Sequence, residues 1–359
     1  MSIRDADALP IPGQGARPEH GGEVLEQSRE AVGGRGWGRW ALGGVFLAGV
    51  ALTIALILHF GWRSIASSVG ALGLAGFAVF CGYTLLVFVL LGWSWFVIAP
   101  DLPYRRLPAF VFGRLMREAA ADTLPFSQLG GFVAGARAAT LLGAPATISV
   151  ATSVVDLGAE MLGQLLFTAV GVAIIAQHAP KGFPHRILDP VLAVGLVVGL
   201  VTAGLFIFSQ QTGLKLLDRF STRWPASMKT QLSSMQEALQ SLYRRPARPL
   251  ISVAAHFGCW IAAMGGVWIV LRFMGAPLSF PTVIAMESLI YLLRSAAFFI
   301  PGAIGVLEGG YILLGPVFGL HPEVALGLSL IKRGRDFALG LPAVLVWQLL
   351  EGRRLLGRR

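Results

Sequence analysis

Long apolar runs are the feature that most constrains how this sequence can fold. A helix that crosses a bilayer needs about 20 mostly apolar residues, because the hydrocarbon core is about 30 Å thick. Five clear runs reach about this length: Trp40–Phe60, Ala71–Ile98, Val150–Ala176, Pro190–Ser209 and Ile251–Met274. A sixth, near Val324–Leu350, is interrupted by charges. The sequence therefore predicts an all-α integral membrane protein with six full spans.

The composition agrees with this prediction and excludes several classes of function. Charged residues make up 13% of the chain and hydrophobic residues 55%, whereas soluble domains carry about 25% charged residues. The net charge of +10 lies in clusters between apolar runs, so we expect no nucleic-acid partner. No metal-ligand spacing, Walker A motif or serine-hydrolase motif is present, so we expect no cofactor and no soluble catalytic domain.

The positions of Lys and Arg predict the orientation, because cytoplasmic loops carry an excess of these residues. Basic residues precede the first run, follow the second and end the chain, and residues 210–250 contain seven basic residues against two acidic ones. We therefore expect both termini and this loop on the cytoplasmic side. The predicted parts are a disordered cytoplasmic tail (1–39), a polytopic membrane domain (40–350) and a basic cytoplasmic tail (351–359).

Two further stretches, Leu107–Gly143 and Phe280–Leu320, are apolar but interrupted by charges, proline and glycine. The orientation requires each stretch to start and finish on one side of the membrane. Each is therefore predicted to be a re-entrant hairpin broken by Pro and Gly, or else a pair of tilted helices. The breaks are expected at Leu124-Pro125 with Gly130-Gly131, and at Pro301-Gly302 with Gly305. Simple kinks, or small residues for close helix packing, are the alternative.

An internal repeat supports this layout. A shift of 176 residues places Pro125 on Pro301, and Glu160 on Asp336. The two halves, about 107–176 and 280–350, have opposite predicted orientations. Inverted repeats with broken helices are typical of transporters, whose sites lie near the middle of the membrane.

Ionisable side chains within these halves are the candidate functional residues, since a charge at the bilayer centre costs about 2.5–3.5 kcal/mol on insertion scales. Arg114 and Glu118 are four residues apart, as are Asp156 and Glu160, so each pair shares a helix face. Both signs occur, so the groups could pair across the bundle. The alternative is that some of these side chains lie at the interface and extend toward the headgroups.

The loop 210–250 contains apolar residues at helical spacing over Leu214–Tyr243, interleaved with Lys and Arg. This pattern predicts an amphipathic helix on anionic headgroups, broken at Pro225. An ordinary cytoplasmic loop is the alternative.

Two motifs resemble those of the lysylphosphatidylglycerol synthase transmembrane-region superfamily, in which members move lipids between leaflets or handle polyprenyl and aminoacyl lipids. The first motif consists of Arg117-Glu118, Leu124-Pro125, Gly130-Gly131 and Arg137. The second consists of Pro301-Gly302, Gly305 and Glu308, followed by Arg333. Ala303-Ile304 stands where many relatives have a further Gly.

Within the superfamily, the stretch Ser295–Ala303 is similar to hopanoid-biosynthesis-associated membrane proteins, which implies a bacterial inner membrane and a hopanoid-type lipid. The lysyl-transferring members carry a large soluble C-terminal domain, whereas this sequence ends at Arg359, so aminoacyl transfer is not expected. The expected partners are the bilayer, a hopanoid-like or anionic lipid, and lipid-biosynthesis enzymes.

The expected function is to bind an amphipathic lipid in a charged intramembrane cavity and to translocate it or hand it on. Arginines would attract the polar head, and acids would pair with them when the site is empty. The predicted site residues are Arg117, Glu118, Pro125, Asp156, Glu160, Arg294, Pro301, Gly302, Glu308, Arg333 and Asp336. The alternatives are a membrane-embedded transferase, an accessory subunit of a lipid-modifying pathway, or a scaffold for its enzymes.

Overall fold

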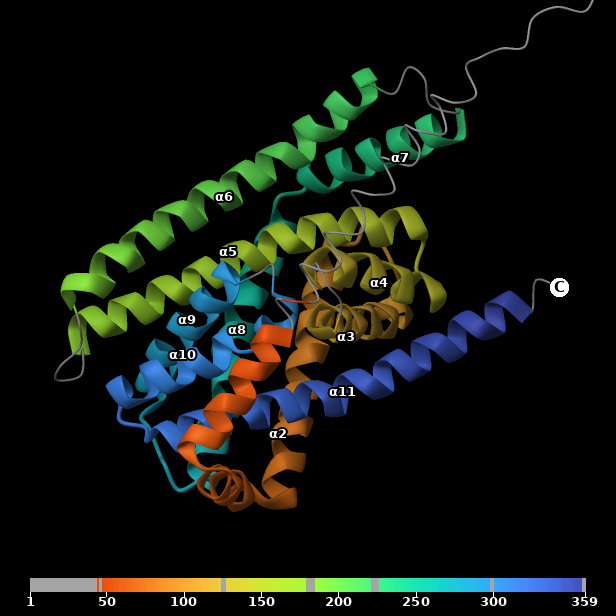
Figure 1. Cartoon of the computed structure of the whole chain (residues 1–359). Coiled ribbons are helices and arrows are strands. Elements are labelled where there is room, and N and C mark those ends of the chain that lie inside the picture. The colour runs from red at the N-terminus through yellow and green to blue at the C-terminus, as the bar shows by residue number, and fades with distance from the viewer. Residues whose placement is uncertain are drawn as a thin grey trace, which may run out of the picture. The chain divides into compact units, whose positions relative to one another are not determined.

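A computed structural model describes residues 44, 47–123, 127–178, 185–220, 226–297 and 300–356. In this part of the chain every regular element is helical, as predicted. The helices are Leu47–Phe60, α2 (Trp62–Ile98), α3 (Leu107–Thr123), α4 (Ser127–Leu141), α5 (Ala146–His178), α6 (His185–Phe220), α7 (Ala226–Tyr243), α8 (Ala247–Phe273), α9 (Phe280–Ala296), α10 (Val306–Leu314) and α11 (Pro322–Leu356) (Figure 1). Among the described residues, short 3₁₀ helices also occur at η1 (Tyr104–Arg106), η3 (Pro301–Ala303) and η4 (Gly315–Phe318).

Several helices are long and apolar enough to cross a membrane, so this is a multi-pass membrane protein. Among the described residues they are Trp62–Ile98, Ala146–Gln177, Leu192–Ser209 and Ala247–Phe273. They correspond to four of the six predicted spans. The described part of the first predicted run is the shorter helix Leu47–Phe60. The last predicted run lies in α11, which carries charges at its centre and continues through Leu356.

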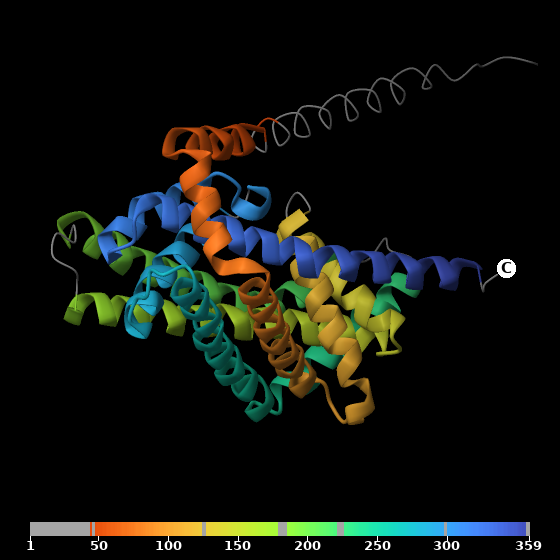
Figure 2. The same cartoon turned by 90° about the horizontal axis from the view of Figure 1, so that it is seen from below.

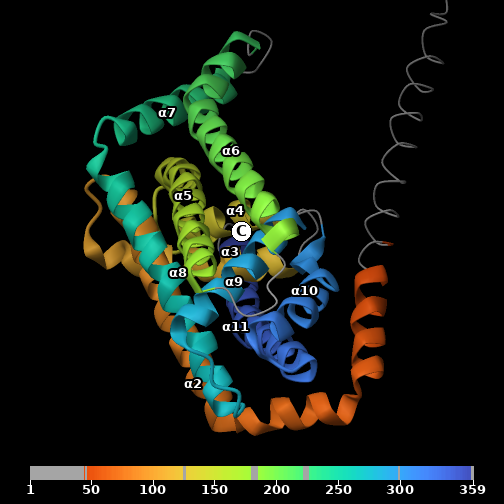
Figure 3. The ribbon, with the colours of Figure 1, turned by 90° about the vertical axis from the view of Figure 1, so that its left-hand side faces the viewer.

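Two glycines interrupt the N-terminal helices. Gly61 separates Leu47–Phe60 from α2, and Gly73 breaks α2 itself, with φ values of 85° and 64°. Glycine adopts positive φ without the steric cost of a side chain. Figure 3 shows the resulting sharp corners between successive helical segments. The long straight part of α2 therefore starts close to Ala71, where the apolar run predicts the span to begin.

The stretch Leu107–Gly143 folds into the antiparallel helices α3 and α4. A Cβ at Gly131 would lie 2.7 Å from the carbonyl oxygen of Arg117, and one at Gly135 would lie 2.8 Å from that of Gly113. Small residues let the two backbones approach this closely. The predicted break at Gly130-Gly131 is wrong, because both residues lie inside the continuous helix α4. Residues 124–126, which include Pro125, lie outside the described residues.

The second stretch is broken where the sequence predicts. Between α9 and α10 the backbone adopts positive φ at Gly302 (56°), Ala303 (48°) and Gly305 (84°). The N–H of Gly305 donates a hydrogen bond to Oε2 of Glu308 at 2.7 Å. A carboxylate at this position satisfies a free N–H of the α10 N-terminus and interacts favourably with the helix dipole.

The order of elements repeats along the chain. The helices α3, α4 and α5 are followed, 176 residues later, by α9, α10 with η4, and α11, and α5 and α11 start at Ala146 and Pro322. In Figures 1 and 2, α5 and α11 run in opposite directions. An inverted repeat would also place these two helices in opposite directions, and the repeat itself stays a prediction.

The end of α7 packs against neighbouring helices. Leu239 and Leu242 are buried against Ile98, Ala151 and Val155. Burial also raises the pKa of the Tyr243 phenol at the end of α7. The side chains of the regularly spaced residues from Leu214 to Leu232, and Pro225, lie outside what the structure describes.

Candidate functional site

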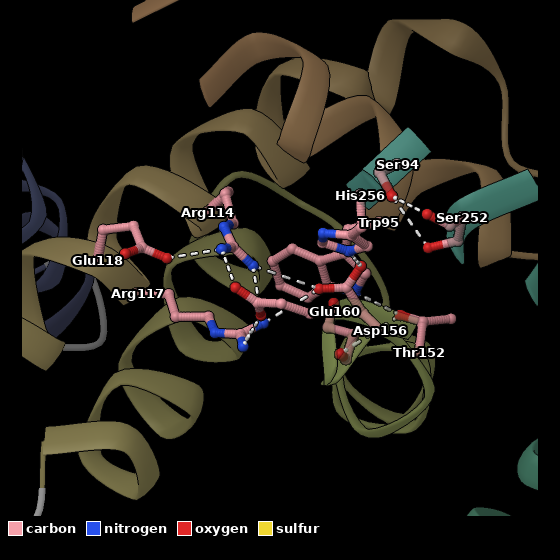
Figure 4. A network of polar contacts seen from close by, with 11 residues as sticks. Ser94, Trp95, Arg114, Arg117, Glu118, Thr152, Asp156, Glu160, Ser252 and His256 are labelled. Carbon is pink, nitrogen blue, oxygen red and sulfur yellow. Dashed lines mark hydrogen bonds and ion pairs between the residues drawn. The ribbon is translucent and has the colours of Figure 1, made fainter. Parts of the chain in front are cut away.

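A network of ion pairs lies between three helices, and we call it the inner network (Figure 4). It is defined by Arg114, Arg117 and Glu118 on α3, Asp156 and Glu160 on α5, and His256 on α8. Residues three or four apart share a helix face, so α3 and α5 each present their charged residues to the other helix. The i, i+4 spacing in the sequence predicted this arrangement for both helices.

The two arginines of α3 form ion pairs with Asp156 and Glu160 of α5. Arg114 donates to Glu160 through both terminal nitrogens, at 3.0 and 2.6 Å, and forms an ion pair with Glu118 at 2.7 Å. Arg117 donates to Asp156 at 3.0 Å and also to Glu160. On the other side of Asp156, Nε2 of His256 lies 2.9 Å from Oδ1.

The inner network is almost completely removed from solvent. Arg114 and Arg117 are 2% and 3% exposed, and Asp156 and His256 are 0% exposed. Removing one partner of a buried ion pair typically costs about 3–5 kcal/mol, because the other charge is left without compensation. The network therefore ties α3, α5 and α8 together, and only Glu118, at 29%, has substantial side-chain exposure.

A second polar cluster joins the helices of the other half. Lys332 on α11 donates to Glu287 on α9 at 2.6 Å and to the Tyr311 hydroxyl on α10 at 2.6 Å. Tyr311 in turn donates to Glu287. At the 176-residue shift Lys332 falls on Asp156, so both halves carry a charge at this position, with opposite sign.

A pocket opens beside this second cluster, and we call it the α11 pocket. Its volume is about 250 Å³. It is lined by Val50, Thr53, Ile54, Ala119, Ile304, Glu308, Leu330, Arg333, Asp336, Phe337, Gly340, Leu341 and Val344. Three of these residues carry charge, and most of the others are apolar.

The charged end of the α11 pocket is built from α10 and α11. Arg333 donates through Nε to Glu308 at 2.9 Å. Asp336 accepts a hydrogen bond from its neighbour Arg335 at 2.6 Å. The Nη2 atom of Arg333 is buried and has no hydrogen-bond partner among the described residues. One donor of Arg333 is therefore left unused by the described residues.

The helix Leu47–Phe60 forms one wall of the α11 pocket. A side chain at Gly49 would collide with the carbonyl oxygen of Ile304, and a Cβ at Gly305 would lie 2.9 Å from Cα of Gly49. The two backbones touch at this point, so two glycines are required. The Pro-Gly break thus positions both the wall helix and the start of α10, which carries Glu308.

The predicted site residues fall into two groups instead of one shared chamber. Arg117, Glu118, Asp156 and Glu160 belong to the inner network, whereas Glu308, Arg333 and Asp336 line the α11 pocket. Pro301 and Gly302 form the break beside the pocket. Arg294 is half-buried at the end of α9 and does not line the pocket. Pro125 lies outside the described residues.

Sequence reasoning did not select five residues that the structure places in these clusters. Arg114 was a candidate charge but was not selected, and Lys332 is one of the charges that interrupt the last apolar run. Glu287 interrupts an apolar helix, which is itself a signal of function. His256 and Tyr311 gave no such signal, because both residue types occur in apolar helices without an ionic role. Among the described residues no cluster of His, Cys, Asp and Glu is suited to hold a metal ion.

Comparison with known proteins gives a match to one family. No curated protein and no solved structure matches the chain. A family profile described as the lysylphosphatidylglycerol synthase TM region matches residues 41–343. This range contains the inner network, the second polar cluster, and all residues of the α11 pocket except Val344. The chain therefore belongs to the lysylphosphatidylglycerol synthase transmembrane-region family.

Proposed function

We propose that this protein binds an amphipathic lipid in the α11 pocket and translocates it between leaflets or hands it on. The observation that carries the proposal is one pocket with two chemically distinct ends. Glu308, Arg333 and Asp336 supply a polar end, and the remaining wall is mostly apolar. Pockets that are mainly apolar with a few polar groups are typical of small-molecule sites.

The polar end fits a headgroup that accepts hydrogen bonds. A movement of the Arg333 side chain would let its unpaired Nη2 donate to such a headgroup, and the carboxylates of Glu308 and Asp336 accept hydrogen bonds from hydroxyl or amino groups. The pocket already balances Arg333 with Glu308, and Arg335 with Asp336. A lipid with an uncharged polyol head would add hydrogen bonds without adding net charge at membrane depth.

The apolar end fits the body of such a lipid. Phe337 and Leu341 line the pocket and are 55% and 56% exposed on the surface of α11. In a bilayer this surface faces hydrocarbon, so a tail can remain partly in the membrane while the head enters the pocket. The apolar surface then stays away from water, and only the head needs polar partners.

The family match and the sequence resemblance extend the proposal to the membrane, the orientation of the chain, the lipid and the partners. We propose a bacterial inner membrane, cytoplasmic N- and C-termini, and a hopanoid-type lipid, with lipid-biosynthesis enzymes as partners. The opposite directions of α5 and α11 support alternating exposure of the site, because inverted repeats can exchange conformations across the membrane.

Reconstitution in liposomes with a fluorescently labelled lipid tests this function. Leu341→Trp adds bulk at a residue that lines the α11 pocket, whereas Leu345→Trp adds the same bulk one helical turn away, at a 60% exposed residue outside the lining. We expect L341W to lower leaflet exchange at least tenfold and L345W to keep the native rate. Equal rates for the two variants would contradict the assignment of the pocket.

The same preparation separates the proposal from its alternatives. Protein-dependent exchange of the labelled lipid between leaflets supports translocation. Conversion of the lipid into a new product, without exchange, indicates a membrane-embedded transferase. Neither exchange nor product would indicate a scaffold for other enzymes.

A further inference from the structure

We propose that an anionic phospholipid binds through its phosphate to a cluster of arginines where the end of α2 meets the starts of α3 and α8. The site is separate from the α11 pocket and does not depend on the function proposed for that pocket. Its basis is that two segments far apart in the sequence bring their arginines together beside an exposed apolar surface. We call the cluster the basic corner, and its members are Arg105, Arg106, Arg244, Arg245 and Arg248.

Side-chain contacts join the two segments of the basic corner. Arg248, at the start of α8, donates to the backbone carbonyl of Ala99 at 2.6 Å and to Asp101 at 3.0 Å. Arg245, in the turn between α7 and α8, pairs with the same acid at 3.4 Å. Figure 2 shows the end of α2 and the starts of α3 and α8 at one edge of the molecule. The sequence alone places these residues in two separate loops.

The charges of the basic corner do not balance. Its five arginines are accompanied by Asp101, whose side chain is 72% exposed. Glu237 is also exposed and lies two turns before Arg244 on the same face of α7. Five positive charges against two negative ones leave an excess of three. Arg105 and Arg244 are exposed, and their side chains make no ion pair or hydrogen bond with the described residues.

Two of the arginines also fix the local backbone. Arg248 binds the Ala99 carbonyl at the end of α2, and Arg106 donates to the Leu142 carbonyl at the end of α4 at 3.3 Å. Cations are favourable at such helix C-termini. The other three arginines of the basic corner are exposed. The corner therefore combines a fixed base with guanidinium groups that a ligand can reach.

An apolar surface adjoins the basic corner and favours a lipid over a free phosphate ion. Leu250 and Ile251 follow directly on α8 and are 65% and 46% exposed. Tyr104 is 76% exposed, and its ring centroid lies 5.5 Å from that of Phe96. Tyrosine is enriched where hydrocarbon gives way to headgroups. A phospholipid can therefore place its acyl chains along α8 while its phosphate reaches the arginines.

The residue type selects the headgroup chemistry. The guanidinium of arginine donates two parallel hydrogen bonds to a phosphate, which the ammonium of lysine cannot do. Basic residues beside a membrane attract anionic lipids, and each one adds to the affinity. A zwitterionic lipid such as phosphatidylcholine brings a cation with its phosphate, and the excess positive charge of the corner disfavours that cation. The ligand class is thus an anionic phospholipid.

Binding of phosphatidylglycerol to the purified full-length protein tests the site. Native mass spectrometry in detergent measures the lipid bound over a concentration series, with phosphatidylcholine for comparison. The variant R105Q/R244Q removes the two arginines that contact no described residue. The matched control R353Q/R354Q removes two exposed arginines at the end of α11, so both variants lose two positive charges.

We expect the native protein and R353Q/R354Q to prefer phosphatidylglycerol to phosphatidylcholine by at least about tenfold. R105Q/R244Q should lose at least about tenfold in affinity for phosphatidylglycerol, because two charges near the surface contribute on this order. Its affinity for phosphatidylcholine should stay unchanged. Melting temperatures without added lipid should agree among the three proteins. If R105Q/R244Q melts earlier, the single variants R244Q and R354Q repeat the comparison, with an expected loss of at least about threefold for R244Q alone.

Two results overturn the site: equal losses in the two double variants, which would show diffuse charge only, or equal affinity of the native protein for the two lipids. Glycerol 1-phosphate distinguishes a lipid from a free phosphate. If it displaces phosphatidylglycerol at an equal concentration, the corner recognises a soluble phosphate and the lipid assignment is wrong. None of these measurements involves lipid exchange, so their failure leaves the function proposed for the α11 pocket to its own test.

Discussion

At the scale of single residues, Asp156 carries the largest share of buried contacts in the inner network. It accepts hydrogen bonds from Arg117 and from His256 and is fully buried. An acid on the surface is in a different position. Asp101 pairs with Arg245 and Arg248, but its side chain is 72% exposed. Water and ions screen such surface pairs, which contribute at most about 1 kcal/mol.

This difference predicts the effect of Asp→Asn at the two positions. D156N leaves Arg117 and His256 facing an uncharged amide. We therefore expect the free energy of unfolding to fall by nearly as much as when a buried ion pair is broken, which is about 3–5 kcal/mol. D101N should change stability by less than about 1 kcal/mol. Thermal unfolding in detergent measures both. Similar melting temperatures for the two variants would show that the inner network does not hold the helices together.

The sequence predicts some of these residues and not others for a physical reason. Arg114 with Glu118, and Asp156 with Glu160, follow from helical periodicity, because residues four apart must share a face. His256 could not be found in this way. Its partner is 100 residues away on another helix, so only the packing of α5 against α8 brings the two together. The residue pattern within one helix is local, whereas the pairing between helices is not.

At the scale of the elements, the same residue type has opposite roles in the two hairpins. Gly302 and Gly305 break the chain with positive φ, whereas Gly131 lies in a regular helix and lets α4 contact the backbone of α3. A pair of glycines in the sequence does not reveal which role it has. The difference depends on the neighbouring helix, which is why the break at Gly130-Gly131 was predicted incorrectly.

Gly→Ala substitutions distinguish a helical glycine that packs against a neighbouring helix from one that does not. At Gly131 the new methyl group would lie 2.7 Å from the Arg117 carbonyl, whereas a Cβ at Gly258 of α8 would have nothing within 4 Å. Alanine favours a helix over glycine by about 1 kcal/mol. We therefore expect G258A to raise the melting temperature or leave it unchanged, and G131A to lower it. A stabilising G131A would contradict the close packing of α3 against α4.

At the scale of the whole molecule, the two halves repeat their element order but not their chemistry. The first half buries acids on α5 opposite arginines on α3, and the second buries Lys332 on α11 opposite Glu287 on α9. The sequence predicts a repeat because proline, glycine and charge recur at one spacing. The separation into a closed network and an open pocket was not visible, since it depends on how the hairpins pack and on the wall helix Leu47–Phe60.

The wall helix leads to a prediction about the α11 pocket as a whole. Gly49 contacts the backbone at Ile304 and Gly305, so Gly49→Leu must push the helix away from the break. The same helix carries Val50, Thr53 and Ile54 of the pocket wall. We expect G49L to reduce lipid exchange in liposomes at least tenfold. Most of the bundle, including the inner network, should stay folded, because it does not depend on this contact.

Gly82→Leu on α2 is the matched control, since a Cβ at Gly82 would have nothing within 4 Å. It should exchange lipid at the native rate and melt at the same temperature. If G49L also exchanges lipid at the native rate, the helix Leu47–Phe60 is not a wall of the functional pocket. If G49L instead melts as early as D156N, the contact at Gly49 holds the fold itself, and the pocket is not an independent part of the molecule.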